Sequence, residues 1–269
     1  MNEKDKKDEG KVFDSEKHSY QTIKARPVKL KDNYDYFNIK WYKRPFTRLA
    51  AFIVLFLMKI FVGPVFFGFK VVNKKALRSA KREKTGYIYI SNHIHPFDAF
   101  LTASAIFTKR IYITMLMTNL GIPVAGKVMK FLAGVPIPEN KNHFRDFKKQ
   151  MKIVLDRGAW IAVYPESALE PYCDHIRPFE KGAIRFALDN DVNILPMVYV
   201  FKKPRGLYRL YKRKPLLHLH ILEPYKLEIK DSKHETVEYN SNVLENMMRD
   251  YLEKQKEIYK SKEKKKTKK

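Results

Sequence analysis

The chain has 269 residues, 45% of them hydrophobic, which is long enough to bury one sizeable core. Its 54 lysines and arginines outnumber 29 aspartates and glutamates, and the net charge of +25 implies an anionic partner: nucleic acid, a membrane surface, or an acidic substrate or carrier protein. The single cysteine, Cys173, excludes an intramolecular disulfide framework and fits a reducing compartment.

A charged N-terminal segment, residues 1–45, precedes a strongly apolar stretch that runs from Phe46 to Phe69. As one helix this stretch would reach about 36 Å, which is enough to cross a bilayer. However, Lys59 lies near its centre, where a charge costs roughly 2.5–3.5 kcal/mol on insertion. We also expect Gly63-Pro64 to break its second half. The apolar runs on the two sides of Lys59 are each about 15 Å long, or half a bilayer.

Basic residues flank the apolar stretch on both sides and so give no charge asymmetry of the kind that orients a span. They are Lys40, Lys43, Arg44 and Arg48 towards its N-terminal end, and Lys70, Lys74, Lys75, Arg78, Lys81 and Arg82 after it. We therefore predict a membrane-associated helical pair over residues 46–72, which enters one leaflet from the cytoplasmic face of the cell membrane. A single span and a buried core helix are the alternatives. A signal peptide is not expected, because a charged stretch precedes the segment and no small-residue cleavage site follows it.

Beyond this segment, short apolar runs alternate with helical patterns. The runs are rich in β-branched and aromatic residues and predict strands at 86–91, 111–117, 160–164, 194–200 and 217–221. The helical patterns lie at 98–107, 124–132, 144–155 and 182–188. This alternation predicts a single α/β domain over residues 73–230, with a largely parallel central sheet flanked by helices. A C-terminal helix with a lysine-rich tail is expected over residues 231–269.

The strand predicted at 86–91 leads directly into Asn92 and His93, and Asp98 follows five residues after the histidine. In parallel sheets, functional residues gather in the loops that leave the carboxyl ends of the strands. Asp98 opens the next predicted helix, so the turn can bring its carboxylate back to the imidazole. A carboxylate on one ring nitrogen fixes the tautomer and raises the basicity of the other nitrogen, which can then take a proton from an attacking alcohol. On its own this spacing is a weak signal.

Four ordered blocks of sequence make the signal stronger, because together they resemble the glycerolipid acyltransferase family, typified by the 1-acylglycerol-3-phosphate acyltransferases. The first block is formed by Asn92, His93 and Asp98. The second block consists of Ile122, Pro123, Gly126 and Ala133-Gly134-Val135-Pro136-Ile137, and the fourth of Ile194-Leu195-Pro196. The third block is Tyr164-Pro165-Glu166-Ser167, and the related stretch Pro178-Phe179-Glu180-Lys181-Gly182-Ala183 follows it. The resemblance covers roughly residues 45–200.

The resemblance implies an enzyme that moves a fatty acyl group from an acyl thioester, of acyl carrier protein or coenzyme A, to the hydroxyl of a lysophospholipid. The first candidate acceptor is 1-acyl-sn-glycerol-3-phosphate, and the implied process is phospholipid biosynthesis. His93 would act as general base and Asp98 would orient it, without a covalent acyl-enzyme. Glu166 would help to shape the acceptor site together with Ser167. The implied partners are the membrane phospholipid surface, the acyl donor and the acceptor; no cofactor, metal or nucleic acid is implied.

The cations that the family uses for phosphate binding are absent from their usual positions. Asn140 and Leu169 stand where the second and third blocks usually carry arginine, and Met115 and Leu116 stand where lysines are usual. Arg145, Arg177 and Lys181 are candidate substitutes, and solvated surface charges are the alternative interpretation. The reaction class is unaffected by these changes, but the acceptor headgroup is left open.

Other classes of protein fit the sequence less well. His93 with His95, or His218 with His220, could be a ligand pair of a metal-dependent hydrolase, but neither pair has a third ligand nearby in the sequence. Ser167 lacks the Gly-x-Ser-x-Gly turn of a serine hydrolase. A basic membrane- or nucleic-acid-binding module without catalysis would explain the charge, but it leaves the four blocks unexplained.

Overall fold

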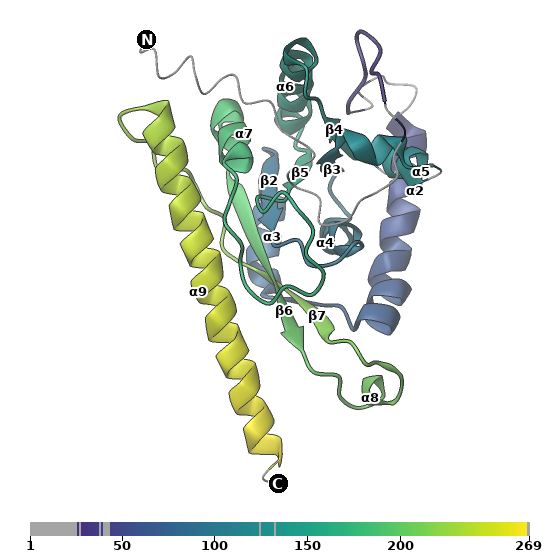
Figure 1. The fold of residues 1–269 in the computed structure, drawn as a ribbon, viewed down its shortest axis with the longest axis vertical. Coiled ribbons are helices and arrows are strands. Elements are labelled where there is room, and N and C mark those ends of the chain that lie inside the picture. The colour runs from purple at the N-terminus through teal and green to yellow at the C-terminus, as the bar shows by residue number, and fades with distance from the viewer. Residues whose placement is uncertain are drawn as a thin grey trace.

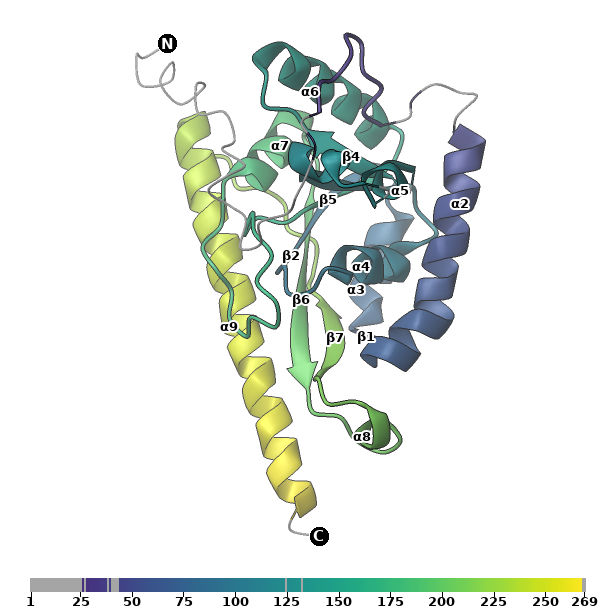
Figure 2. The ribbon, with the colours of Figure 1, turned by 45° about the vertical axis from the view of Figure 1, so that its right-hand side comes forward.

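The computed structural model describes residues 26, 28–37, 39, 44–123, 125–131 and 133–267, so most of the predicted N-terminal segment lies outside the described residues. A seven-stranded sheet forms the centre of the molecule, with helices on both of its faces (Figures 1 and 2). The predicted fold class, a single α/β domain with a largely parallel sheet, is confirmed.

The strands lie in the order β1-β7-β6-β2-β5-β3-β4 across the sheet. Their bounds are β1 (Lys70–Val72), β2 (Tyr87–Ser91), β3 (Ile111–Leu116), β4 (Gly134–Ile137), β5 (Trp160–Val163), β6 (Ile194–Lys202) and β7 (Leu216–Ile221). Neighbouring strands are parallel except for β6 and β7, which are antiparallel. The five predicted strands are present. The two others escaped prediction because β1 is very short and β4 contains Gly134 and Pro136, which are tolerated at the edge of a sheet.

The four helices predicted between the strands are present, and others accompany them. The helices are α2 (Arg44–Leu57), η2 (Met58–Phe67), α3 (Lys74–Arg82), α4 (Asp98–Ile106), η3 (Met117–Gly121), α5 (Ala125–Phe131), α6 (Lys141–Asp156), α7 (Gly182–Asn190), α8 (Tyr208–Tyr211) and α9 (Lys233–Thr267). Successive residues of β2 point to opposite faces of the sheet. Ile88 and Ile90 join the core beneath α6, α7 and α9, whereas Tyr87 and Tyr89 join the core beneath α2, α3 and α4.

The apolar stretch forms two contiguous helices, α2 and η2, and the predicted break at Gly63-Pro64 is wrong. Pro64 lies inside η2, which is a π-helix. Its wider turn accommodates a residue that has no N–H and that would clash with the preceding turn of an α-helix. A Cβ atom on Gly63 would lie 2.5 Å from the carbonyl oxygen of Met58, so this position requires glycine. The helix ends instead at Gly68, which has a φ of 56° and donates its N–H to the Pro64 carbonyl.

Helix α9 covers β6 and β7, and two buried histidines of β7 face its tyrosines. His218 Nδ1 lies 3.1 Å from the Tyr259 hydroxyl, and His220 lies 3.0 Å from the Tyr251 hydroxyl through Nδ1 and 2.9 Å from the Tyr259 hydroxyl through Nε2. The pKa of both histidines is lowered to about 4, mainly by burial, and Lys202 contributes to the effect at His218.

We expect these two histidines to make the fold sensitive to acid between pH 6.5 and about pH 4. In this window the unfolded chain binds protons at both imidazoles whereas the folded state does not, so stability falls as the pH falls and is constant above the window. The free energy of urea unfolding in detergent should be lower at about pH 5 than at about pH 7.5, by on the order of 2 kcal/mol for each histidine. The His218→Gln/His220→Gln variant should lose most of this difference. An unchanged pH dependence in that variant would contradict the assignment.

Candidate active site

The predicted catalytic pair lies at the carboxyl end of β2, a central strand of the sheet, in the loop that leads to α4. His93 Nδ1 lies 2.9 Å and 3.1 Å from the two carboxylate oxygens of Asp98. The Asp98 side chain is fully buried, whereas 23% of the His93 side chain is exposed. The buried oxygens therefore hold Nδ1, and Nε2 is the ring nitrogen that remains for a substrate.

The Asp98 carboxylate also closes the turn between His93 and α4. The peptide N–H groups of Ile94 and His95 donate to its Oδ2 atom at 2.7 Å and 3.0 Å. Asp98 is the first residue of α4, where the helix macrodipole favours a negative charge. With the carboxylate as acceptor, we assign the imidazole proton to Nδ1, which makes Nε2 an acceptor. An imidazole held in this way can remove a proton from a hydroxyl group.

Two residues that follow β5 also hold His93. The Tyr164 ring packs against the imidazole, with the ring centres 4.3 Å apart and the planes inclined by 33°. Glu166 Oε2 accepts a hydrogen bond of 3.1 Å from the His93 peptide N–H. The first and third sequence blocks therefore meet at His93, because β2 and β5 are neighbouring parallel strands.

Glu166 in turn forms a buried ion pair with Arg177. Arg177 Nη2 and Nε lie 2.9 Å and 3.2 Å from Glu166 Oε2, and the Arg177 peptide N–H donates to Oε1 at 3.2 Å. The Glu166 side chain is fully buried and 10% of the Arg177 side chain is exposed. Burial raises the pKa of Glu166, and the guanidinium group opposes that effect. Arg177 also donates to the Ala168 carbonyl, so its guanidinium is directed into the loop that carries Glu166.

The other two predicted substrate-binding residues lie in different surroundings. Ser167 follows Glu166 directly and donates its peptide N–H to the Tyr164 carbonyl at 3.1 Å. Lys181 precedes α7 and forms an ion pair with Glu238 of α9, in which both side chains are partly exposed. The structure therefore brings Glu166, Ser167 and Arg177 together beside His93, whereas the Lys181 side chain turns towards α9.

Ser167 adopts a φ of 60°, which explains why the resembled block carries glycine at this position. We expect Ser167→Gly to keep stability near that of the wild type. Ser167→Val should lower it by about 1–2 kcal/mol, because a β-branched residue fits the left-handed region poorly. Thermal unfolding measures the difference, and Ser79→Val at an exposed position of α3 is the control for the loss of a serine. An equal effect of both valine substitutions would contradict the explanation.

A layer of polar contacts behind the loop was not predicted from the sequence. Asn92 Oδ1 accepts a 2.8 Å hydrogen bond from the Tyr199 peptide N–H, which joins the end of β2 to β6. The Tyr199 hydroxyl donates to the Asp98 carbonyl at 2.9 Å and lies 2.8 Å from Thr102 Oγ1. Asn92 belongs to the first block, but only the register of β2 with β6 identifies Tyr199 as its partner.

His95 belongs to an aromatic cluster. Its Nδ1 accepts a 3.1 Å hydrogen bond from the Phe97 peptide N–H, and its ring centre lies 5.0 Å from that of Phe67 and 5.7 Å from that of Tyr172. Burial lowers the pKa of His95. Because Phe67 ends η2, the apolar helix touches the loop that carries His93. Within the described part of the chain, no group of three or more His, Cys, Asp or Glu residues is placed to hold a metal ion.

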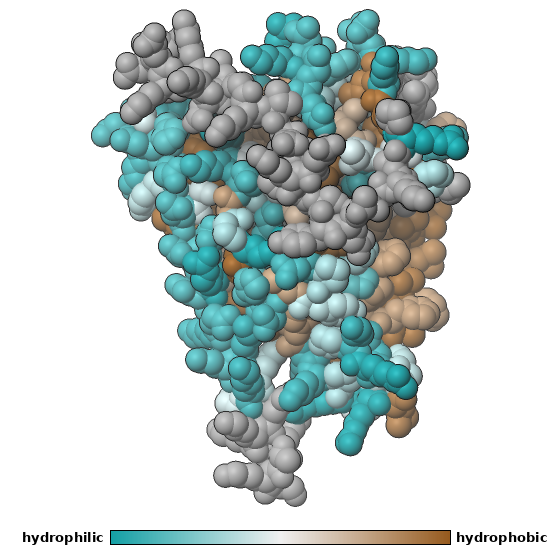
Figure 3. All heavy atoms as spheres, viewed as in Figure 1, coloured by the Kyte–Doolittle hydropathy of each residue, from teal (hydrophilic) through white to brown (hydrophobic). Residues whose placement is uncertain are grey.

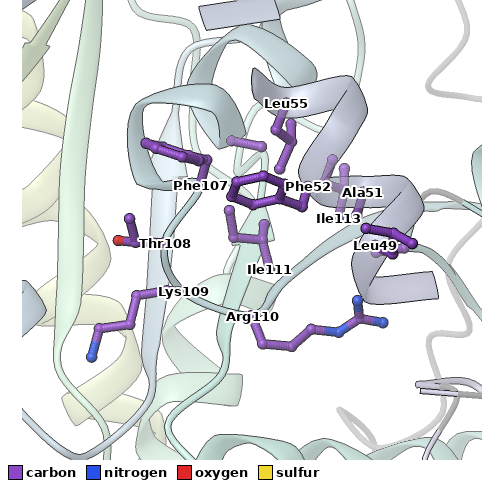
Figure 4. Close-up of a pocket in the computed structure, with 12 residues that line it drawn as sticks. Leu49, Ala51, Phe52, Leu55, Phe107, Thr108, Lys109, Arg110, Ile111 and Ile113 are labelled. Carbon is purple, nitrogen blue, oxygen red and sulfur yellow. The ribbon is translucent and has the colours of Figure 1, made fainter. Parts of the chain in front are cut away.

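A cavity of about 640 Å³ lies apart from the predicted catalytic pair, between α2 and the body of the domain (Figure 4). Its apolar wall includes Leu55 and Phe52 of α2, and the Phe52 ring lies 5.8 Å from that of Phe107, which follows α4. Lys109 and Arg110 extend to opposite sides below this apolar cluster. The cavity shows that α2 is incompletely packed against the sheet.

The geometry around His93 agrees with a comparison of the sequence with known families. Residues 68–200 match the family model described as Acyltransferase. The chain carries an acyltransferase domain over these residues. The match extends from the end of η2 into β6 and includes His93, Asp98, Glu166 and Arg177. The predicted class of enzyme, an acyltransferase, is confirmed.

Solved structures similar to this acyltransferase include the crystal structure of the 1-acyl-sn-glycerophosphate (LPA) acyltransferase PlsC from Thermotoga maritima. The two chains are 17% identical, and the alignment covers 80% of this chain and 78% of that chain with a TM-score of 0.49. A comparison with curated proteins gives no significant match. The assignment of this acyltransferase to its family therefore rests on the family match over residues 68–200.

Proposed function

We propose that this acyltransferase moves a fatty acyl group from an acyl thioester to the free hydroxyl of a lysophospholipid, with His93 as general base. The observation that carries the proposal is the His93 imidazole, which the buried Asp98 carboxylate holds through Nδ1. Nε2 would take the proton of the acceptor hydroxyl while its oxygen attacks the thioester carbonyl carbon. The new C–O bond forms, the C–S bond breaks, and the thiolate leaves without an acyl-enzyme intermediate. Asp98 would stabilise the imidazolium that forms.

The loop from Glu166 to Arg177 is proposed to position the base and to border the acceptor. Glu166 holds the His93 peptide and Arg177 holds Glu166, which favours a positioning role for both residues. Ser167 lies next to Glu166 and would border the acceptor. The ion pair of Lys181 with Glu238 weighs against the predicted part of Lys181 in phosphate binding. Within this scheme, 1-acyl-sn-glycerol-3-phosphate is the first acceptor to test, with acyl carrier protein or coenzyme A as the carrier of the donor.

We further propose that α2 and η2 bind one leaflet at the cytoplasmic face of the membrane. The helix from Leu49 to Phe67 has 19 residues and a mean hydropathy of 2.4, which by length and composition is enough to cross a membrane. However, α2 packs against α4 and α5, and η2 packs against α4. A spanning arrangement would therefore draw the body of the domain into hydrocarbon, where exposed loops are not tolerated. Binding along the helix instead uses its exposed apolar side, which Figure 3 shows in brown.

Turnover of defined substrates tests the reaction. The full-length protein in phospholipid vesicles receives a radiolabelled long-chain acyl thioester, of either coenzyme A or acyl carrier protein, and one lysophospholipid at a time. Label should enter the diacyl product only when an acceptor with a free hydroxyl is present. Release of free fatty acid without acceptor-dependent product would indicate a hydrolase. Vesicle binding without either product would indicate a non-catalytic module.

A further inference from the structure

The loop between β6 and β7, residues 203–215, combines exposed leucines with clustered cations. Leu207 and Leu210 of this loop are 78% and 82% exposed, the highest values among the large hydrophobic side chains that the structure describes. Its basic residues are Lys203, Arg205, Arg209, Lys212, Arg213 and Lys214, and its sequence contains no acidic residue. Exposed apolar side chains rimmed by charge are typical of a surface that binds a partner. The composition of the loop indicates a partner that is apolar and anionic at once.

The loop is attached to the end of the apolar helix. The hydroxyls of Tyr208 and Tyr211 donate to the carbonyls of Pro64 and Val65 at 2.7 Å and 3.0 Å. Lys212 Nζ donates to the next carbonyl, that of Phe66. The last carbonyls of a helix have no partners within the helix. These three side chains therefore help to cap the end of η2, where the Pro64 carbonyl also accepts the Gly68 N–H. Both ribbon views place α8 close to that end (Figures 1 and 2).

This attachment makes the leucines of the loop part of a larger apolar surface. Ile60, Phe61 and Phe66 of η2 are 60%, 56% and 56% exposed, and the loop lies directly beyond them. A leaflet of anionic lipid supplies both hydrocarbon for the leucines and phosphates for the cations. A nucleic acid would neutralise the cations but would leave the leucines in water. Charge complementarity and continuity with the apolar helix therefore select a lipid surface.

We propose that the β6–β7 loop is a second membrane contact, in which Leu207 and Leu210 enter an anionic leaflet while Arg209 and Arg213 bind lipid phosphates. This inference goes beyond the proposed function, because neither acyl transfer nor binding through α2 requires it. One helix lying on a surface can roll about its axis, whereas a second contact beside it stops that rotation. The two contacts together would keep the aromatic cluster of His95, and the His93 loop with it, facing the lipid.

Insertion is tested with an environment-sensitive fluorophore on single introduced cysteines of the full-length protein. Cys173 is buried, and unmodified protein serves as the control for its labelling. With vesicles of phosphatidylcholine and phosphatidylglycerol, labelled Leu210→Cys should show blue-shifted emission that a quencher carried by the lipid tails suppresses. Labelled Phe56→Cys, from the exposed side of α2, reports leaflet binding itself. Labelled Ile229→Cys is the matched negative control, because this residue is 68% exposed and lies between β7 and α9.

These probes separate the two proposals. A blue shift at labelled Phe56→Cys without one at labelled Leu210→Cys would overturn the second contact and leave leaflet binding intact. The absence of a blue shift at both positions would overturn leaflet binding and the second contact together. A response at Leu210→Cys that exceeds the response at Ile229→Cys supports the inference.

The cations of the loop are tested by vesicle partitioning. Arg209→Gln/Arg213→Gln should weaken binding to anionic vesicles by about fivefold for each cation and leave binding to neutral vesicles unchanged. Lys149→Gln/Lys226→Gln removes the same charge from exposed positions of α6 and of the segment after β7. An equal loss in both double variants would overturn the loop contact and leave only an effect of net charge. Loss of RNA binding with unchanged vesicle binding would assign the loop to nucleic acid instead.

Discussion

His93→Ala is expected to abolish acyl transfer while folding and vesicle binding persist. Removal of a positioned general base typically costs 10²–10⁴-fold or more in rate, so kcat/KM should fall by about this factor. The side chain is partly exposed, and the Asp98 carboxylate keeps the peptide N–H groups of Ile94 and His95 as donors. The substitution should therefore leave the turn in place. Steady-state kinetics, together with thermal unfolding and vesicle sedimentation of the same preparation, measures both effects.

Two neighbouring variants sharpen this experiment. Asp98→Asn should lower the rate and preserve the fold, because an amide that donates to Nδ1 would impose the wrong tautomer on His93. His95→Ala should reduce activity far less, since His95 packs with Phe67 and Tyr172 and accepts its hydrogen bond from the backbone. Substantial turnover by well-folded His93→Ala protein would contradict the mechanism.

Arg177→Ala is expected to destabilise the protein by about 3–5 kcal/mol, because it leaves the Glu166 carboxylate buried without its partner. The rate of acyl transfer should also fall, since Glu166 accepts a hydrogen bond from the His93 peptide N–H. Chemical unfolding in detergent measures the stability. The double variant Glu166→Leu/Arg177→Met removes both charges and should recover most of the lost stability but not the activity. Lys181→Ala is the matched control: its ion pair with Glu238 is partly exposed, so its loss should cost about 1 kcal/mol or less.

Kinetics decide between two roles of Arg177. If its guanidinium binds the phosphate of the acceptor, then Arg177→Lys should raise the KM for phosphate-bearing acceptors alone. If Arg177 instead positions the loop through Glu166, then kcat should fall equally for acceptors with and without a phosphate. The contacts of Arg177 with Glu166 and with the Ala168 carbonyl lead us to expect the second result.

The strands that carry the site could be predicted because they lie between other elements and are buried on both faces. β2 and β5 each show an unbroken run of buried residues, which gives a clear apolar pattern in the sequence. Strand β4 lacks such a pattern because Pro136 and Gly134 interrupt it. Pro64 is a related case. A proline predicts the end of an α-helix, and the sequence does not reveal that the turn around it has widened.

The contact between His93 and Asp98 could be predicted because both residues lie in one short turn next to a strand. The contacts that support it could not. Tyr199 is 107 residues from Asn92, and only the pairing of β2 with β6 brings them together. The sequence leaves Arg177 as a candidate for phosphate binding because it does not show that Glu166 is buried against it. The sequence also does not show that Lys181 pairs with Glu238, which belongs to a helix much later in the chain.

The pairing of β1 with β7 has a consequence for how the protein is made. Asn73, directly after β1, donates its side-chain amide to the carbonyl of Ile221, across a separation of 148 residues. At the usual rates of translation the ribosome needs roughly 7–30 s to synthesise the residues between these two positions. During this interval α2 and η2 have already been synthesised, whereas β7 and the loop that caps η2 have not. The nascent chain thus presents this apolar helix before the sheet beside it can close, so the proposed binding to the bilayer could begin during translation.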